Sequence, residues 1–441
     1  MNVSHGTAEV LPEAVQERVL ALAAQMYGCV MSEALSAATA EERVAELSRQ
    51  VGQEVLSAGL SEAYGRHSGT ARPCACGQWQ RFVNYRPRTL MTLLGPVRYQ
   101  RAYYHCAACK ASCYAGEDAL GLDGSSFTLP AQEAVALVSA EVPFERARVL
   151  LWRLSGLKVA VSHAQHLCQR HGLRLLQARQ AECEALFAGT QEYLPQRRDH
   201  RLYVTLDATK TRFTDDWHET RVGAVYDAKP GQDRMDEPDC TTYVTTLAAT
   251  GLEAFGQALY QEAAYRGLDH AKEQVVIADG APWIWNLAAE HFPQATQILD
   301  FYHASERLHH VARAAYGEGT AEAKAWAQRS VARRSAGDWK GLLCSLKALR
   351  PKTRDGTEAV RLAVGYFETN RQRMDYPAYR AKGMHIGSGV VEAACKHVVG
   401  ARCKRAGMRW TTTGAETTLA LRTQLLNDRW DDYWQPLKAA A

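Results

Sequence analysis

The sequence predicts a multidomain α+β protein, and three observations support this fold class. First, 441 residues exceed what one ordinary hydrophobic core accommodates. Second, stretches with the apolar period of helices alternate with stretches rich in β-branched and aromatic residues. Third, the composition is 46% hydrophobic and 23% charged, as in globular proteins. No apolar run approaches the roughly 20 residues that span a bilayer, and no signal-peptide pattern opens the chain. We therefore expect a cytoplasmic protein without a membrane partner.

The first region, residues 1–69, is predicted to be helical. Apolar residues recur at spacings of three and four through LPEAVQERVLALAAQMYGCV. A second helix is expected at SAATAEERV, where Thr39 would be the N-cap and Glu42 would complete a capping box. The pattern is equally compatible with a helical pair inside one chain and with the seam of a dimer.

Residues 70–120 change to a β-rich composition bracketed by cysteines. The stretch FVNYRPRTLMTLLGPVRYQRAYYHC indicates strands broken at Gly95-Pro96. Twelve cysteines are many for an intracellular protein, and a secreted disulfide scaffold would be shorter and would carry a signal peptide. Metal binding explains the local cluster better. Its five members lie within 40 residues of one another: Cys74, Cys76, Cys106, Cys109 and Cys113.

The cysteine spacing favours a zinc-ribbon-like module with a structural Zn²⁺ ion. Cys106-x-x-Cys109 is a standard metal knuckle, whereas Cys74-x-Cys76 is one residue shorter than the usual pair. Four thiolates suit the tetrahedral site that Zn²⁺ prefers. Cys113 in place of Cys74 or Cys76, or a ring nitrogen of His105, remains an alternative ligand.

Residues 126–195 are predicted to form a helix-turn-helix-like region that binds DNA. Two helical patterns lie in FERARVLLWRLSGLKVAVSHAQHLCQRHG, with Ser155-Gly156 between them and Ser162 as the expected N-cap of the second. A short turn between amphipathic helices is typical of DNA-binding helix-turn-helix units. Periodicity alone does not separate this interpretation from an ordinary helical hairpin.

From residue 198 onward the sequence predicts an α/β core. Strand-like segments such as RLYVTLD, QVVIADGAP and ATQILDFYH alternate with helical ones over residues 198–303. Residues 304–382 are helical in pattern and basic, with eleven Lys or Arg against five Asp or Glu in the stretch 304–355. Residues 383–441 begin with a loop and continue into a helix.

Three acidic residues of this part are the candidate catalytic groups. Asp207 and Asp279 each end a predicted strand, and Glu392 lies in the first turn after Gly387-Ser388-Gly389. Taken singly, each aspartate is also a possible helix cap, and the glutamate is favoured by the helix dipole. Together, the three carboxylates would hold two Mg²⁺ or Mn²⁺ ions about 3.5–4 Å apart, which is the arrangement that cuts and joins phosphodiesters.

Clustered positive charge predicts a nucleic-acid partner. Residues 81–101 carry five Arg without an acid, and residues 393–415 carry five Lys or Arg without an acid. The ordinary alternative is that basic runs are solvated faces. The side chains expected to contact DNA are Lys396, Arg402, Lys404, Arg405, Arg409, Trp410, Arg98 and Arg101.

Three segments carry a resemblance to a known family. LDATKTR, VVIADGAPWIWNLAAEHFPQATQILDFYHASERL and HIGSGVVEAACKHVVGARCKRAGMRW resemble the catalytic blocks of DDE transposases of bacterial insertion sequences. The similarity is to the Kra-type group, which is related to the Mutator-like transposases, and it runs over most of residues 70–425. The third segment is the most specific, because it combines Gly-Ser-Gly, the glutamate and an Arg-Cys-Lys-Arg-x-Gly-x-Arg-Trp run.

This resemblance implies a fold, further site residues and partners. The implied fold is an RNase H-like core interrupted by the helical insertion, with Asp207, Asp279 and Glu392 as the catalytic triad. Asp300 and His303 match the short Asp-x-x-His element of the family, which implies an auxiliary role for both. The implied setting is a bacterial, nucleoid-associated homo-oligomer that binds double-stranded DNA at element ends and at the target.

Three functions compete at this point. The favoured one is a transposase that cleaves DNA at element ends and transfers strands. A nuclease of the same fold would cut without rejoining. A zinc-ribbon DNA-binding regulator, or an inactive relative of the transposases, would carry these acids only as structural groups.

Overall fold

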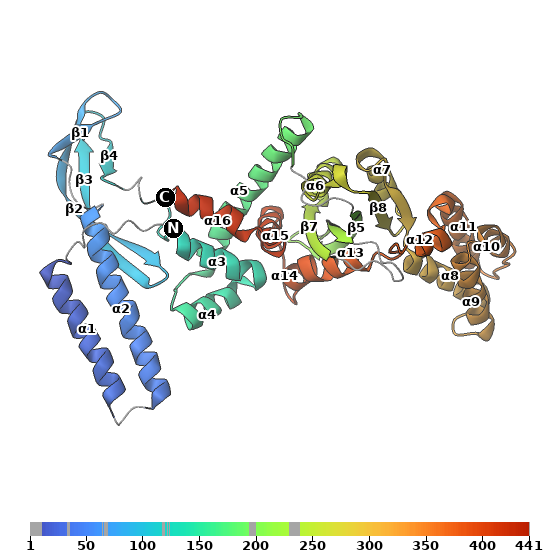
Figure 1. Ribbon diagram of the computed structural model, residues 1–441, viewed down its shortest axis with the longest axis horizontal. Coiled ribbons are helices and arrows are strands. Elements are labelled where there is room, and N and C mark those ends of the chain that lie inside the picture. The colour runs from blue at the N-terminus through green and yellow to red at the C-terminus, as the bar shows by residue number, and fades with distance from the viewer. Residues whose placement is uncertain are drawn as a thin grey trace. The chain divides into compact units, whose positions relative to one another are not determined.

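The computed structural model describes residues 11–32, 36–63, 65, 69–116, 120, 122, 124–193, 200–228 and 239–440. The architecture is α+β, as expected, with helices and two β-sheets (Figure 1). The chain divides into two compact units, one of residues 1–168 with 430–441 and one of residues 169–429. None of the described helices combines the length and the apolarity that crossing a bilayer requires.

The first unit opens with two helices that pack side by side, α1 (Glu13–Met31) and α2 (Ala37–Ala63). The expected cap of the second helix is wrong. Helix α2 begins at Ala37, and the hydroxyl of Ser36 accepts from the backbone N–H of Thr39 at 3.3 Å. Thr39 is therefore inside the helix, because Ser36 already satisfies an N–H of its first turn.

A four-stranded antiparallel sheet follows, in the order β1-β2-β3-β4. Its strands are β1 (Ala71–Pro73), β2 (Trp79–Thr92), β3 (Gly95–Cys106) and β4 (Ser112–Tyr114). Thr92 pairs with Gly95, so the reversal lies at Leu93-Leu94 and not at Gly95-Pro96. Gly95 opens β3 at φ +108°, a backbone conformation that favours glycine.

The remaining helices of the first unit are α3 (Leu129–Glu141), α4 (Phe144–Ser155), the start of α5 (Val161–Phe187) and α16 (Trp430–Ala439). Gly156 ends α4 in the left-handed conformation, at φ 72°, where the sequence predicted a turn. Helix α5 begins at Val161, so Ser162 lies inside its first turn and is not its N-cap. Val135, Leu151 and Leu167 join α3, α4 and the start of α5 in one apolar core.

The second unit is built on a five-stranded sheet in the order β7-β6-β5-β8-β9. Its strands are β5 (Arg201–Arg212), β6 (Trp217–Ala228), β7 (Asp239–Leu247), β8 (Glu273–Ala278) and β9 (Thr296–Leu299). Strand β5 pairs antiparallel with β6 and parallel with β8. The first half of β5 is buried at every residue, as expected for a strand covered on both faces.

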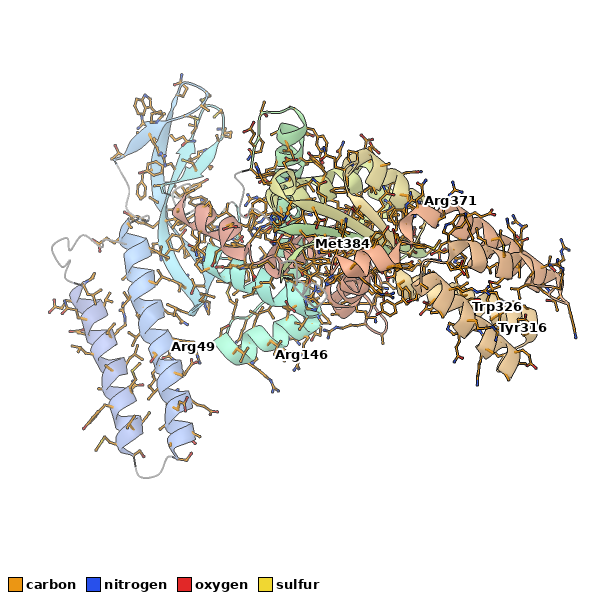
Figure 2. All side chains as sticks on the ribbon, turned by 45° about the vertical axis from the view of Figure 1, so that its right-hand side comes forward. Arg49, Arg146, Tyr316, Trp326, Arg371 and Met384 are labelled. Carbon is orange, nitrogen blue, oxygen red and sulfur yellow. The ribbon has the colours of Figure 1, made fainter. Side chains whose placement is uncertain are left out.

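Two groups of helices complete the second unit. Helices α6 (Leu252–Tyr265) and α7 (Pro282–His291) alternate with its strands. The segment predicted to be helical and basic contains α8 (Phe301–Tyr316), α9 (Ala321–Ser335), α10 (Trp339–Lys347), α11 (Arg354–Thr369) and α12 (Tyr376–Ala381). Figure 2 labels Tyr316 near the end of α8 and Trp326 on α9. The C-terminal part of the unit contains α13 (Gly389–Ala394), α14 (Ala401–Cys403) and α15 (Thr412–Leu426).

A buried ion pair links β6 to the end of α6 and provides a test of this packing. Arg266 donates to Asp227 at 2.5 Å, and the side chains are only 8% and 3% exposed. We expect Arg266→Met to lower the free energy of unfolding by about 3–5 kcal/mol, because it leaves a buried carboxylate without its main cation. Urea unfolding measures the change. The control Arg361→Met removes a cation from an exposed pair with Glu358, which solvent screens, so its effect on unfolding should be much smaller. Equal losses for the two variants would contradict the prediction.

Candidate catalytic and metal-binding sites

Asp207 lies inside strand β5, although the sequence predicted it at the end of a strand. The strand continues to Arg212, but its parallel pairing with β8 stops at Thr205 and Ile277. Asp207 therefore projects from the part of β5 that has passed the end of β8. Because Asp207 is in a strand, the alternative that it caps a helix does not apply.

Strand alternation decides which face of the sheet Asp207 occupies. Side chains two residues apart share a face, so Asp207 lies on the same face as Tyr203. The Tyr203 ring stacks on that of Tyr226, with centroids 4.9 Å apart, and its hydroxyl accepts from the backbone N–H of His385 at 3.1 Å. The loop before α13 thus covers this face. The thiol of Cys395, at the end of α13, donates to Asp207 at 3.8 Å, so the C-terminal segment reaches the aspartate.

Asp279 follows β8 directly, as predicted. Its carboxylate accepts from the backbone N–H of Ala281 at 2.9 Å, while Ala281 itself is the N-cap of α7. The hydroxyl of Tyr366, on α11, donates to the backbone carbonyl oxygen of Asp279 at 2.7 Å. Asp279 is therefore not the N-cap of α7. The hydrogen bond from Tyr366 ties the backbone of Asp279 to α11.

The glycine after Asp279 allows this close approach. Gly280 has φ +96°, and a Cβ added to it would lie 2.7 Å from the Tyr366 ring and 2.8 Å from Leu299. We expect Gly280→Ala to lower the free energy of unfolding by about 2–4 kcal/mol, from backbone strain together with overpacking. Gly319→Ala is the control, because Gly319 has φ +75° with no atom within 4 Å of its Cβ position. Thermal or urea unfolding should show that the control loses only about 1 kcal/mol; an equal loss would mean that the contact with Tyr366 does not matter.

Asp300 holds two segments of the site together. It is the N-cap of α8, where its carboxylate accepts from the backbone N–H of His303 at 2.6 Å. The other carboxylate oxygen of Asp300 accepts two hydrogen bonds from Ser388. One comes from its backbone N–H and one from its hydroxyl, which is 2.7 Å away. Burial of Asp300 favours a raised pKa, but the donors from His303 and Ser388 outweigh it and lower the pKa below its usual value. Asp300 therefore stays charged and ties the Gly-Ser-Gly loop to α8.

His303 and Glu392 meet beside Asp300. His303 lies in the first turn of α8, so it is not at a strand end. Its Nδ1 atom is 3.4 Å from an Asp300 oxygen and 3.7 Å from an oxygen of Glu392, which lies in the first turn of α13 as predicted. The nearby carboxylate of Asp300 and the charges of Glu392 and Asp279 raise the pKa of His303 to about 9. The ring is therefore positively charged at neutral pH.

Electrostatic coupling joins the three acids that the sequence singled out. Burial raises the pKa of Asp207, and the negative charges of Asp279 and Glu392 raise it further. Asp279 and Glu392 likewise act on His303. Asp300, His303 and Glu392 form a tight group, with possible ligand atoms within 4.8 Å of one another. Asp207 and Asp279 lie outside that group but within range of its charges.

The basic residues after Glu392 divide into exposed and buried ones. Lys396, Lys404, Arg405 and Arg409 are exposed, and Lys404 donates to the hydroxyl of Thr209 on β5. A π-helical turn, Cys395–Gly400, follows α13 directly, and Lys396 lies within it.

Two of the predicted DNA contacts in this segment are wrong. Arg402 is fully buried with its guanidinium 4.9 Å from the centroid of the Trp410 ring, and Trp410 is only 6% exposed. The indole N–H of Trp410 donates to the carbonyl oxygen of Cys403 at 3.1 Å. Both side chains pack inside the unit, so neither presents a surface to DNA.

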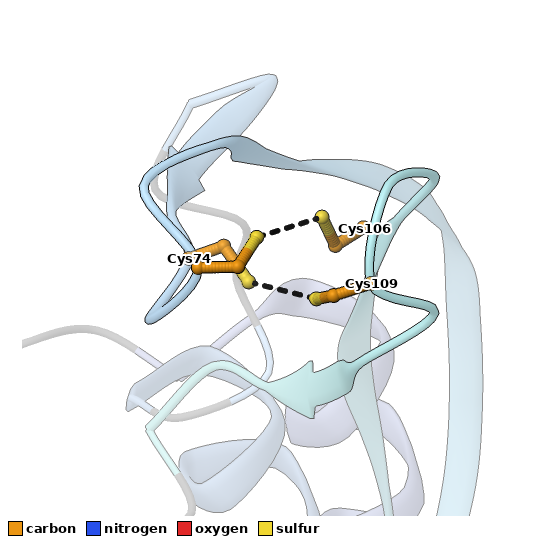
Figure 3. A group of neighbouring side chains, drawn as sticks. Cys74, Cys106 and Cys109 are labelled. Carbon is orange, nitrogen blue, oxygen red and sulfur yellow. Dashed lines mark hydrogen bonds between the residues drawn. The ribbon is translucent and has the colours of Figure 1, made fainter.

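The four predicted zinc ligands come together in the first unit, and Figure 3 shows their sulfur atoms converging from two loops. The Cys74 and Cys109 sulfurs are 3.5 Å apart, and those of Cys76 and Cys106 are 3.7 Å apart. A tetrahedral site with Zn–S bonds of about 2.3 Å places its sulfurs roughly 3.8 Å apart. The geometry and the donor type therefore fit a Zn²⁺ ion.

Local backbone conformation explains how unequal cysteine spacings form one cluster. The residue after the second cysteine of each loop has a positive φ, 84° at Gly77 and 61° at Lys110. Each loop therefore reverses at the same point, although one has a single residue between its cysteines and the other has two. Backbone N–H groups of Cys109 and Ala108 lower the pKa of Cys106, whereas contacts with the Cys109 and Cys74 thiols raise the pKa of Cys76 despite a backbone N–H from Gln78.

The alternative zinc ligands have other partners. The thiol of Cys113 donates to the side-chain oxygen of Gln80 at 2.7 Å, and Nδ1 of His105 is 3.1 Å from the hydroxyl of Ser112. Neither residue belongs to the cysteine cluster.

The two predicted DNA contacts on the same sheet differ in exposure. Arg98 is exposed, whereas Arg101 is half-buried with its guanidinium 3.7 Å from the centroid of the Tyr114 ring.

A cleft beside Asp279 contains residues that the sequence analysis missed. Its volume is about 440 Å³, and the lining residues are Asp279, His303, Glu306, Arg307, His310, Arg313 and Tyr366. Those between 303 and 313 recur at spacings of three and four, which places them on one face of α8. That spacing was visible in the sequence, whereas the approach of Tyr366 from α11 was not.

Comparison with known families gives one match. Residues 30–428 match the model of a family described as uncharacterised protein family UPF0236. A search of curated proteins finds no match to the chain.

Proposed function

We propose that this chain, which belongs to the uncharacterised protein family UPF0236, is a DDE-type transposase that cuts and joins DNA. The observation that carries the proposal is the convergence of segments from β5, the end of β8 and α13. His303 is 3.7 Å from Glu392 and lines the same cleft as Asp279, and Cys395, just after α13, donates to Asp207 at 3.8 Å. Clustered carboxylates repel one another, and a cluster of this kind is stabilised by bound cations.

The donor set fits divalent metal ions. Carboxylate oxygens are the ligands that Mg²⁺ and Mn²⁺ prefer, and the exposed part of the site leaves room for water and phosphate oxygens. Two such ions, when bound, supply activation of the attacking hydroxyl and stabilisation of the leaving oxygen. The chain contributes the three carboxylates that hold them, and a ring N–H of His303 can donate to a phosphate oxygen.

Asp300 has a different role in this proposal from that of the three acids. It is fully buried and its oxygens already accept from His303 and Ser388. We assign it to positioning: it orients His303 and fixes the loop that leads to Glu392. This role agrees with the auxiliary place that the family resemblance implies for both residues.

The arrangement of the second unit is compatible with an RNase H-like core. The mixed sheet places β5 beside β8, and helices α8 to α12 lie between the last strand and Glu392, as an insertion before the glutamate requires. In the first unit, the cysteine cluster supports a zinc-ribbon module, and α4 with the start of α5 supports a helix-turn-helix-like one. We propose that these modules bind element ends and that the protein acts on DNA as a homo-oligomer.

A labelled DNA duplex that carries the flanking ends of the coding region tests the proposal. Incubation with Mg²⁺ should give cleavage at the ends, followed by joining of the freed 3′ ends to a second duplex. Cleavage without joining would identify a nuclease instead. Binding without any cleavage would identify a DNA-binding regulator with structural acids.

A further inference from the structure

The cleft beside Asp279 combines positive charge with a flat stacked surface. The guanidinium of Arg307 lies 4.2 Å from the centroid of the Tyr366 ring, and Arg307, His310 and Arg313 are exposed along one face of α8. Arg313 also forms a 3.4 Å pair with Glu318, but both of these side chains are exposed, so the pair is weak. The guanidinium groups therefore remain accessible to an anion.

The size of the cleft matches a small part of a nucleic acid. Its volume of about 440 Å³ lies in the range of pockets that hold a single small ligand. The face from His303 to Arg313 extends about 15 Å at 1.5 Å per residue. Successive phosphates of one strand are about 3.4 Å apart along a duplex, so this face can contact more than one phosphate.

The charges inside the cleft also suit a strand that leads away from the catalytic acids. Glu306 is the one acidic lining residue besides Asp279. Asp279 is among the groups that bound cations would neutralise, which leaves the two arginines, Arg307 and Arg313, against Glu306. The sugar-phosphate backbone of a DNA strand whose end lies at Asp279 can thus run along α8.

We propose that this cleft binds a single DNA strand next to the cleavage point, with one base unpaired and stacked on the Arg307–Tyr366 pair. A base inside a duplex cannot enter a cleft of this size, whereas an unstacked base can lie on an aromatic ring or on a guanidinium plane. Tyr366 also donates to the carbonyl oxygen of Asp279, so the stacking surface is fixed relative to the catalytic carboxylate. That the bound strand is DNA next to a cleavage point rests on the proposed function.

Binding of short DNA without cleavage tests this inference. A fluorescent oligo(dT) strand and a duplex of equal length are titrated with the full chain in Ca²⁺ in place of Mg²⁺. We expect Arg307→Ala to weaken oligo(dT) binding about tenfold and duplex binding less than about twofold. The slope of log K for oligo(dT) binding against log[salt] should also decrease in magnitude by about 0.7, which corresponds to one lost phosphate contact.

Matched variants distinguish the cleft from general loss of charge. Arg329→Ala removes an exposed arginine from α9 outside the cleft lining, and it should bind oligo(dT) as the parent does. Tyr366→Leu should weaken oligo(dT) binding, whereas Tyr316→Leu, at an exposed tyrosine near the end of α8 (Figure 2), should not. Arg307 is exposed, so its variant should fold even if the half-buried Tyr366 position does not tolerate leucine.

Two results would overturn the inference. One is equal oligo(dT) affinity for Arg307→Ala and Arg329→Ala, and the other is a parent protein that does not bind oligo(dT). Neither depends on cleavage, so failure of the proposed transposase activity in Mg²⁺ is a separate result. A protein that cleaves DNA but fails the oligo(dT) test would retain the proposed function and lose only this strand-binding site.

Discussion

Asp207→Asn, Asp279→Asn and Glu392→Gln should each abolish Mg²⁺-dependent DNA cleavage, with a loss of at least about 100-fold in rate. Each substitution keeps the shape of the side chain and removes the negative charge that holds a cation. Binding to DNA ends should remain intact, because the cysteine cluster and α4 belong to the other unit and none of the three acids belongs to a candidate end-binding module. Gel assays of cleavage and of binding on the same labelled duplex measure both properties.

A second measurement separates loss of the metal site from loss of folding. In metal-free protein, Asp279→Asn removes a charge that repels Asp207, so it should not lower the free energy of unfolding. The parent should gain thermal stability when Mg²⁺ is added, because the ion binds the folded state, and the variant should gain much less. Glu368→Gln, at an exposed glutamate paired with Lys347 on a different surface, serves as the control and should behave as the parent does. If two of the three active-site variants still nick DNA at the parental rate, the site assignment is wrong.

Cys106→Ser combined with Cys109→Ser should remove about one zinc per chain and unfold residues 70–115. The four sulfurs come together at one end of the small sheet, whose neighbouring apolar cluster is small and centres on Ala102, Tyr104 and Ala115. Structural zinc contributes about 10–16 kcal/mol of apparent binding free energy in zinc-finger peptides. Metal analysis gives the zinc content, and hydrogen exchange of β1, β2, β3 and β4 reports the unfolding. The second unit, with its own sheet and core, should keep its protection.

The control for the zinc prediction is a cysteine in the same sheet. Cys113 donates to Gln80 and does not belong to the cysteine cluster, so Cys113→Ser should retain the zinc of the parent. Equal zinc content in the double variant and in the parent would reject the cysteine cluster as the site. Zinc loss in Cys113→Ser alone would instead favour the alternative ligand set.

Several features could be predicted from the sequence because they depend on local spacing. The period of three and four identified the helices between residues 301 and 381, and the run of β-branched and aromatic residues identified β2 and β3. The paired cysteines identified their own cluster, since a metal knuckle is a short local motif. Asp279 was placed correctly at a strand end because β8 is a short buried run with a sharp boundary.

Other features depend on contacts between distant segments, and only the tertiary structure decided them. Arg402 and Trp410 belong to a basic run that resembles an exposed face, yet they are buried because the segment after α14 pairs with the end of β5. Asp207 lies inside a strand because β5 extends beyond the end of its partner β8. The sequence by itself determined the candidate acids, the cysteines and the alternation of elements. The fold decided which charges are exposed and how Tyr366 approaches Asp279, because burial and proximity arise from packing that no local period encodes.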